Sequence, residues 1–221
     1  MAADLRLLRL LHLASPALPI GAFHFSQGLE YAVHAHWVHD ESSAHAWIDG
    51  LAGNALASLD LPLLCRLYAA WSAIDLATVQ HWNAILVASR ETSELRAEEL
   101  HLGAALAKVL RELDVDAPGA GHGYGYVAMF TLACSSWSID LPQALQTYAW
   151  VWLENQVLAA VKLVPLGQSA GQRITNALIP QLVQIAERAP QLPDEDIGTS
   201  ALMQIVASSR HESQYSRLFR S

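Results

Sequence analysis

Charged residues are scarce in this sequence. Charged residues make up only 15% of its 221 residues, and acidic side chains outnumber basic ones by 21 to 13, which gives a net charge of −8. Binding to the phosphate backbone of nucleic acid needs a basic patch, so this balance argues against nucleic acid as the main partner. Because hydrophobic residues reach 52%, we expect a partner protein to cover part of the surface.

Strand-forming residues and cysteines are also scarce. Alanine (36) and leucine (35) far exceed valine and isoleucine, which together number 23, and this bias favours helix over strand. The two cysteines, Cys65 and Cys134, belong to no disulfide or metal-binding motif, so we expect each to be a small core residue in a reducing cytosol. The first residues lack the uninterrupted apolar core of an export signal, which predicts a cytoplasmic protein.

Apolar residues recur with helical spacing along most of the chain, and no segment alternates as a strand would. Asp60-Leu61-Pro62 and Asp140-Leu141-Pro142 repeat one helix-start signal, an aspartate near the cap followed by a proline in the first turn. Ser26 and either Asp40 or Ser42 are further predicted caps. The predicted helices cover residues 5–13, 26–36, 42–58, 61–72, 75–89, 91–113, 122–137, 143–164 and 172–189, the last with a kink at Pro180.

These patterns predict an all-α fold. We expect a single-domain helical bundle of roughly eight to ten helices with a linker-connected C-terminal helical tail. Residues 1–189 are predicted to form the core domain. Residues 190–199 are rich in proline and acidic residues and are predicted to be a linker, so residues 190–221 form a linker and a partner-binding tail.

The most apolar helical pattern runs from Gln143 to Val164 and carries only two charges, Glu154 and Lys162. A helix that is apolar on all sides is buried in a core or crosses a membrane, and polar interruptions argue against a span of about 20 apolar residues. We therefore predict a central buried helix that ends at Pro165 and no membrane partner. Lys162 has two interpretations: its stem carries the ammonium past the helix end to solvent, or the ammonium contacts a partner protein.

No pattern carries a specific catalytic, cofactor or metal signal. His34, His36 and His39 lie close enough to share a metal, but they lack acidic or thiolate company, so a surface histidine group is favoured. The glycine-rich loop 121–125 follows no strand and lacks the Gly-Lys-Ser/Thr ending of a phosphate loop, so it is interpreted as a tight turn. There is no Gly-x-Ser-x-Gly motif. We predict no catalytic, cofactor-binding or metal-binding residues.

Two further segments carry charge. Arg90 and Glu94 stand four residues apart, and this spacing favours an ordinary solvated helix face. The last residues could be a disordered terminus, but arginine beside apolar and aromatic residues is typical of an interface anchor. The residues in question are Arg210, Tyr215, Arg217, Leu218, Phe219 and Arg220.

Four separated blocks, in chain order, resemble the UreF family of urease accessory proteins, especially its enterobacterial type. The resemblance spans nearly the whole chain, and the four blocks together are far more specific than any one of them. The blocks are Leu18-Pro19-Ile20-Gly21 followed by Ser26-Gln27-Gly28-Leu29-Glu30; Arg90-Glu91-Thr92 with Arg96 and Gly103; Lys162-Leu163-Val164-Pro165-Leu166-Gly167-Gln168; and the tail from Ser209 to Ser221.

The resemblance implies an all-α accessory protein with no catalysis of its own and no tightly bound cofactor. It also implies a homodimer that bridges UreD (also called UreH) and the GTPase UreG, regulates that GTPase and supports nickel insertion into apo-urease. The implied residues on the UreG side are Lys162, Phe23, Ser26 and Glu30. The implied residues on the UreD/UreH side are Arg210, His211, Glu212, Tyr215, Arg217, Leu218 and Phe219.

Two alternative functions compete with this one. An all-α small-molecule-binding protein would need a pocket with convergent polar groups, for which His122, Tyr124 and Asn155 are candidates. A direct nickel-binding chaperone would use the histidines between His34 and His39.

Overall fold

The structure, a computed structural model, describes residues 2–198 and 201–220, and within them the regular elements are helical. The predicted all-α class is confirmed. The α-helices are α1 (Ala2–Leu13), α2 (Leu29–His34), α3 (Glu41–Leu51), α4 (Leu61–Ser72), α5 (Leu76–Ala88), α6 (Ser93–Glu112), α7 (Tyr126–Ser136), α8 (Leu141–Leu163), α9 (Gln168–Arg188) and α10 (Leu202–His211).

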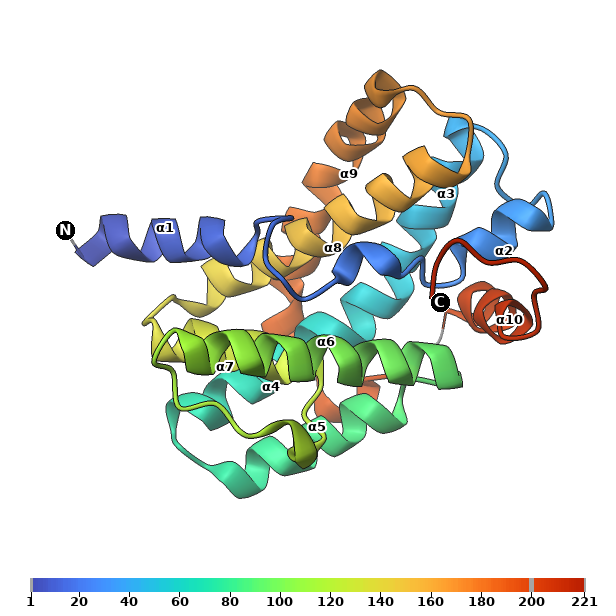
Figure 1. The fold of residues 1–221 in the computed structure, drawn as a ribbon. Helices are drawn as coiled ribbons and strands as arrows, with labels where there is room; N and C mark the ends of the chain where they lie inside the picture. The colour runs from blue at the N-terminus through green and yellow to red at the C-terminus, as the bar shows by residue number, and fades with distance from the viewer. Residues whose placement is uncertain (1, 199–200, 221) are drawn as a thin grey trace.

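Helix α8 lies at the centre of the fold and packs against α9, α4, α7 and α1 (Figure 1). Its buried residues lie on several sides of the helix, so the prediction of a central core helix is confirmed. Helix α7 is buried along nearly its whole length between α4 and α6, and the side chains of Met129 and Phe130 have no exposed surface. Apolar burial on this scale is the main stabilising contribution to such a fold.

Side-chain caps start several helices where the sequence predicts them. Asp40 accepts a 2.8 Å hydrogen bond from the backbone N–H of Ser43 at the start of α3. Asp140 accepts one of 2.9 Å from the N–H of Gln143 at the start of α8. These bonds satisfy N–H groups that have no partner within the helix.

The cap predicted at Asp60 is wrong. Its backbone is helical (φ −66, ψ −52), whereas a cap residue needs an extended backbone. A π-helix from Ala52 to Asp60 joins α3 to α4, so one unbroken helical rod replaces the two predicted helices at 42–58 and 61–72. π-Helical turns are rare and are common at functional sites. Here the π-helix ends on a carboxylate that is only 4% exposed.

Four other predicted boundaries, in three helices, are also wrong. The predicted cap Ser26 is not the cap of α2, which begins after Gly28, and α2 ends at His34 because His36 turns the chain with a left-handed φ of 58°. Helix α7 begins at Tyr126 instead of residue 122, because a 3-10 turn precedes it. Helix α9 begins at Gln168 and continues through Pro180 as a single helix.

The two cysteines are free and buried, as predicted. No helix within residues 2–198 and 201–220 is long and apolar enough to cross a membrane.

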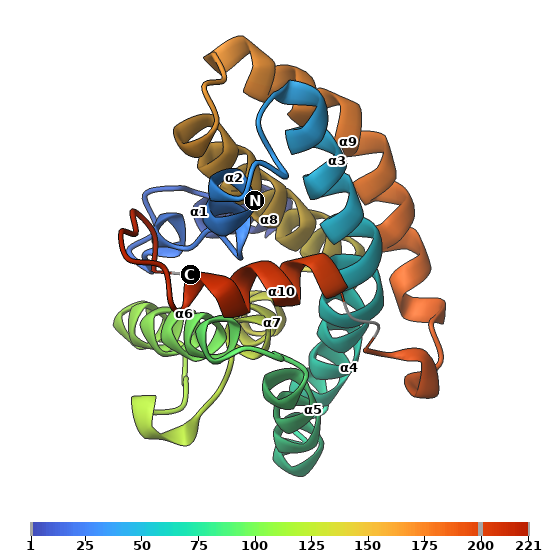
Figure 2. The same ribbon diagram turned by 90° about the vertical axis from the view of Figure 1, so that its right-hand side faces the viewer.

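The C-terminal segment folds back onto the domain. Before it, two 3-10 turns run beside α4, where Arg66 donates a 2.8 Å hydrogen bond to Asp194 and the N–H of Gly198 donates one of 3.0 Å to the carbonyl of Ser58. Helix α10 then packs across α2 and α6 (Figure 2). The tail is thus in contact with residues from the first third of the chain.

Candidate partner-binding surface

The N-terminal block from Leu18 to Glu30 crosses the middle of the fold and supports the tail. Gly28 has a left-handed φ of 87°, which a glycine adopts without steric strain. A Cβ atom at this position would lie 3.1 Å from the Cβ of Ala207 and 3.1 Å from the backbone nitrogen of Ser208. A side chain at position 28 would therefore push α10 away from α2.

The carboxylate of Glu30 holds the end of the tail. Glu30 is only 8% exposed, and its two oxygens accept hydrogen bonds from the backbone N–H groups of Leu218 (2.6 Å) and Phe219 (2.8 Å). Hydrogen bonds to an ionised acceptor are shorter and about twice as strong as neutral ones. Residues 218 and 219 are thereby fixed beside α2, and the Phe219 side chain is buried in the core.

His211 lies fully buried between two carboxylates. Its Nε2 is 3.1 Å from Glu30, and its Nδ1 is 2.8 Å from Glu94. Carboxylate oxygens accept hydrogen bonds, so both contacts are hydrogen bonds only when both ring nitrogens carry a proton. Arg217 adds a guanidinium group at 2.9 Å from Glu94. The tail is thus fastened to α2 and α6 by two glutamates.

Lys162 is exposed in the last turn of α8 and lies beside two aromatic rings. Its ammonium is 5.6 Å from the ring centroid of Phe23 and 5.8 Å from that of Phe219. A cation at this distance from an aromatic ring is attracted to the ring face. One lysine therefore connects the N-terminal block to the tail while its charged end stays in solvent.

The residues implied by the family resemblance divide into two groups. Four are buried: Ser26, Glu30, His211 and Phe219, and Glu30 joins the N-terminal block to the other two in the tail. Seven are exposed around that junction: Phe23, Lys162, Arg210, Glu212, Tyr215, Arg217 and Leu218. The buried group supports the surface, and the exposed group forms it. Their assignment to UreG or UreD stays a prediction.

Arg90 does not lie on a solvated helix face, so that interpretation is wrong. Its side chain is only 14% exposed, and its guanidinium contacts Asp60 at 2.7 Å and Glu99 at 2.6 Å. A second oxygen of Glu99 accepts a 3.0 Å hydrogen bond from the N–H of Val127, near the start of α7. Burial raises the pKa of Asp60 to about 6, and the neighbouring Arg90 opposes part of that rise.

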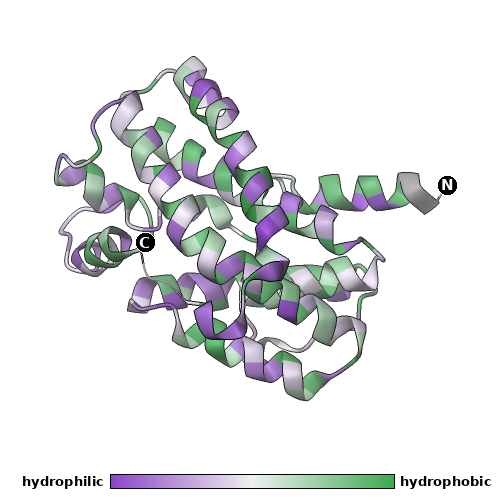
Figure 3. Cartoon of the chain, turned by 180° about the vertical axis from the view of Figure 1, so that it is seen from behind, coloured by the Kyte–Doolittle hydropathy of each residue, from purple (hydrophilic) through white to green (hydrophobic). Residues whose placement is uncertain are grey.

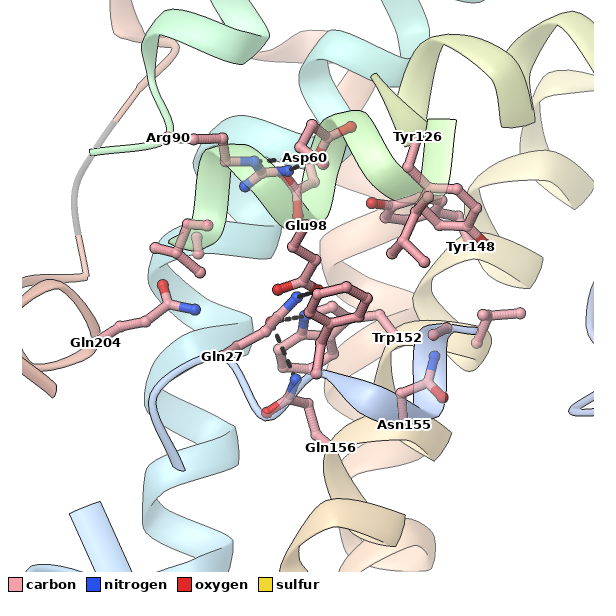
Figure 4. A pocket seen from close by; sticks show the side chains of 17 residues that line it. Gln27, Asp60, Arg90, Glu98, Tyr126, Tyr148, Trp152, Asn155, Gln156 and Gln204 are labelled. Carbon is pink, nitrogen blue, oxygen red and sulfur yellow. Dashed lines mark hydrogen bonds and ion pairs between the residues drawn. The ribbon is translucent and has the colours of Figure 1, made fainter. Parts of the chain in front are cut away.

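A small polar cavity lies between this cluster and α8 (Figure 4). Its volume is about 50 Å³, room for a few water molecules. Sites for small-molecule ligands are usually about 300–1,000 Å³. Asn155 lines this cavity, Tyr124 lines a different crevice between α6 and the loop before α7, and His122 is exposed. The three candidate ligand residues therefore do not converge.

The histidine hypothesis also lacks a converging site. Among the residues that the structure describes, no group of three or more histidine, cysteine or acidic side chains is arranged to hold a metal ion. His39 lies 3.7 Å from Asp40, its neighbour in the chain, and both side chains are exposed.

The sequence did not predict that Glu94 and Gln27 make long-range contacts that support this surface. Glu94 contacts His211, which lies 117 positions away, and Gln27 contacts Gln156, which lies 129 positions away. No local signal marks contacts at such separations. The one available signal for Glu94 was its place beside the Arg-Glu block of the family resemblance.

The fold and the surface together define an all-α protein in which apolar and basic side chains surround a clamped C-terminal tail. Aromatic and arginine side chains are enriched at protein interfaces, so this arrangement is typical of a protein-binding module. The structure therefore favours a role in protein recognition.

The comparisons agree on one family. The UreF family model matches residues 38–179. Proteins named urease accessory protein UreF are similar over nearly the whole chain. The relative from Alkalilimnicola ehrlichii is 46% identical over 220 residues, covering 96% of this chain and 95% of its own. That from Hahella chejuensis is 45% identical over 221 residues (98% and 99%), and that from Azoarcus sp. is 47% identical over 225 residues (98% and 96%). This chain belongs to the UreF family.

Proposed function

We propose that this chain is a urease accessory protein that bridges UreD (UreH) and the GTPase UreG, regulates that GTPase, and supports the insertion of nickel into apo-urease. Full-length similarity to proteins named urease accessory protein UreF supports the role in urease maturation. In this proposal nickel is cargo of the assembled complex, and the chain itself contributes binding surfaces. It carries out no catalysis and acts on urease in the cytoplasm.

The observation that carries the bridging role is the contact of Lys162 with both Phe23 and Phe219. The surface assigned to UreG contains Lys162 and Phe23, and the surface assigned to UreD/UreH contains the exposed tail residues Tyr215 and Leu218. Because Phe219 is buried beside Lys162, the two surfaces share one support. A partner that moves the tail would also move the groups around Lys162.

Helix α1 supports the proposed homodimer. It extends from the body of the molecule (Figure 3), and four of its leucines are exposed, whereas Leu10 and Leu13 are buried. Arg6 donates a hydrogen bond to the carbonyl of Ser138, and Arg9 lies over the ring of Trp137. Each of the four leucines is more than half exposed: Leu5 at 59%, Leu7 at 55%, Leu8 at 62% and Leu11 at 57%. An apolar face of this kind is typical of an interface, and a second copy presents the same uncharged leucines.

The bridging role is tested by co-purification with UreD and UreG. The comparison uses the full chain and a chain that ends at Ser213. Truncation at Ser213 keeps the buried His211, which contacts both Glu30 and Glu94. We expect the full chain to retain both partners and the shortened chain to lose UreD more than UreG. A full chain that retains neither partner, or equal loss of both on truncation, contradicts the assignment.

The dimer is tested separately by analytical ultracentrifugation of Leu8→Glu. A charge placed on the apolar face of α1 should shift the protein toward monomer. Leu202→Glu is the matched control, because Leu202 is 68% exposed on α10 and lies away from α1. If Leu8→Glu and Leu202→Glu have the same mass in solution as the unsubstituted chain, α1 does not form the dimer.

A further inference from the structure

Helix α10 has its polar side against the fold and its large apolar side chains toward solvent. Its buried residues recur with helical spacing and are small or polar: Gln204, Ala207, Ser208 and His211. Its large apolar residues lie on the other side and are exposed: Leu202 at 68%, Met203 at 52% and Val206 at 38%. A surface helix normally buries its apolar side and exposes its polar side. The reversed orientation of α10 indicates that its outer side is a contact surface.

Hydrogen bonds on the inner side hold α10 in this orientation. The hydroxyl groups of Ser208 and Thr92 share a 2.7 Å hydrogen bond, and both side chains are buried. One turn further along, His211 contacts the carboxylates of Glu30 and Glu94. Rotating α10 to bury Leu202 would break these contacts and strand buried polar groups, which is unfavourable. The apolar side therefore stays outward, on the outside of the fold (Figure 2).

The charge of this segment is opposite in sign to that of the rest of the chain. Residues 201–221 contain three arginines and one acidic residue, a net charge of +2 in a chain whose total is −8, so residues 1–200 carry −10. Arg217 is paired with Glu94, whereas Arg210 is exposed. Arg210 follows Val206 by four residues and so extends the outer side of α10. An acidic contact surface would complement this charge.

We propose that the outer face of α10, formed by Leu202, Met203, Val206 and Arg210, docks a partner protein whose contact surface is apolar and flanked by acidic side chains. The inference rests on the proposed function, in which UreD/UreH is the partner of the C-terminal segment, and it specifies the chemistry that this partner supplies. Burial of the apolar side chains provides affinity, and the arginine steers and orients the partner.

Two other occupants fit the charges less well. In a two-fold dimer through this face the same patch lies on both copies, so the two Arg210 side chains would repel each other. An anionic membrane surface attracts basic helices, but it would repel a chain with a net charge of −8. The charges therefore favour an acidic protein surface.

Matched valine substitutions test the apolar part of the face. Val206→Ser removes an apolar contact from α10, and Val183→Ser is the control, because Val183 on α9 is also 38% exposed. We expect Val206→Ser to weaken UreD binding about threefold to tenfold in a quantitative pull-down, as burial of the remaining valine surface predicts. Val183→Ser should bind as the unsubstituted chain does. Equal binding by the two variants overturns the proposal.

Matched arginine substitutions test the acidic character of the partner. Arg210→Glu and Arg188→Glu make the same charge change, each at an exposed arginine in the last turn of a helix. We expect Arg210→Glu to weaken UreD binding about tenfold or more at low salt, and the loss to shrink as sodium chloride is added. Arg188→Glu should have little effect. Unchanged or tighter binding by Arg210→Glu overturns the proposal.

The unsubstituted chain distinguishes this inference from the function on which it rests. If the full chain retains no UreD, the proposed function fails and this inference fails with it. If the full chain retains UreD and the α10 variants bind as the α9 variants do, only this inference fails. Binding of the full chain, but not of Val206→Ser, to phosphatidylglycerol vesicles also overturns it. So does a shift of Val206→Ser toward monomer in analytical ultracentrifugation, because a second copy would then occupy the face.

Discussion

Glu30 and Phe219 are joined by a 2.8 Å hydrogen bond that spans 189 positions of the chain, from the backbone N–H of Phe219 to the carboxylate of Glu30. This bond holds the end of the tail against the N-terminal block, and it positions the Phe219 ring beside the ammonium of Lys162. Two of the four blocks that carry the family resemblance are thereby brought into direct contact with a third.

Replacing Glu30 with glutamine should loosen the tail. The glutamine side chain keeps the shape but replaces one acceptor oxygen with a donor, while Leu218, Phe219 and His211 all need acceptors. We expect a loss of about 1–3 kcal/mol in unfolding free energy and faster tryptic cleavage at Arg217. Glu187→Gln, at an exposed position on α9, is the control. Equal behaviour of the two variants would show that the carboxylate does not hold the tail.

The buried Asp60 should make stability depend on pH. Its pKa is raised to about 6 by burial, against an ordinary value of 3.8, so between these values the folded protein holds a proton that the unfolded chain has lost. The contribution of Asp60 to stability is therefore greatest below about pH 4 and declines as pH rises toward 6, by up to roughly 3 kcal/mol. In Asp60→Asn this decline should be absent, as measured by urea unfolding between about pH 4 and 7.

Asp75 provides a control with the opposite sign. Hydrogen bonds from the side chain and backbone of Thr78 lower the pKa of this exposed helix cap. Its contribution is present above the ordinary pKa and is lost as pH falls through the lowered value. Asp75→Asn should therefore keep the decline that Asp60 produces. If Asp60→Asn retains the decline in full, Asp60 is not its source.

Ile74 ends α4 in an unfavourable backbone conformation. It has a left-handed φ of 55°, which is strained for a β-branched residue, and its side chain is 82% exposed. Ile74→Gly should relieve the strain without loss of packing and raise the unfolding free energy by about 0.5–1 kcal/mol. Ala73→Gly is the matched control, because Ala73 has a right-handed backbone (φ −87) and should lose stability with glycine. A loss of stability in both variants would contradict the prediction.

Replacing Lys162 with alanine should weaken partner binding and leave the stability of the fold nearly unchanged. The lysine is exposed, and its contacts with Phe23 and Phe219 contribute about 0.5–1 kcal/mol, so unfolding should change little. We expect UreG binding to weaken about tenfold, the effect of roughly 1.4 kcal/mol, and urease activation to fall. Lys108→Ala, at an exposed position on α6, should retain both activities. Unfolding of Lys162→Ala would instead indicate a structural role.

Local patterns predicted the helices well where the decisive contacts lie within one turn. The caps at Asp40 and Asp140 bond to N–H groups three residues away. Hydrophobic periodicity identified α8 as the central core helix because apolar residues on all its sides need burial. The same rules do not predict the chemistry at Asp60, which carries the same start signal as Asp140.

Long-range pairing explains that difference. Asp60 and Arg90 are 30 positions apart, and their ion pair forms where the connection between α5 and α6 meets the end of the π-helix. The Arg90 side chain is only 14% exposed. Its two carboxylate partners offset the cost of removing the guanidinium from water, because burying an unpaired charge is far costlier than burying a paired one. The spacing to Glu94 suggested a surface pair, but Glu94 instead pairs with His211 and Arg217.

The sequence by itself determined the all-helical class, the central helix and most helix starts, because each depends on hydrogen bonds and periodicity within a few residues. It also contained the blocks that identify the family. Only the tertiary structure decided that Glu30 clamps the tail, that Arg90 contacts two buried carboxylates, and that four leucines of α1 stay exposed. These features depend on which distant segments meet, and a side chain acquires its partner only when packing excludes water from around it.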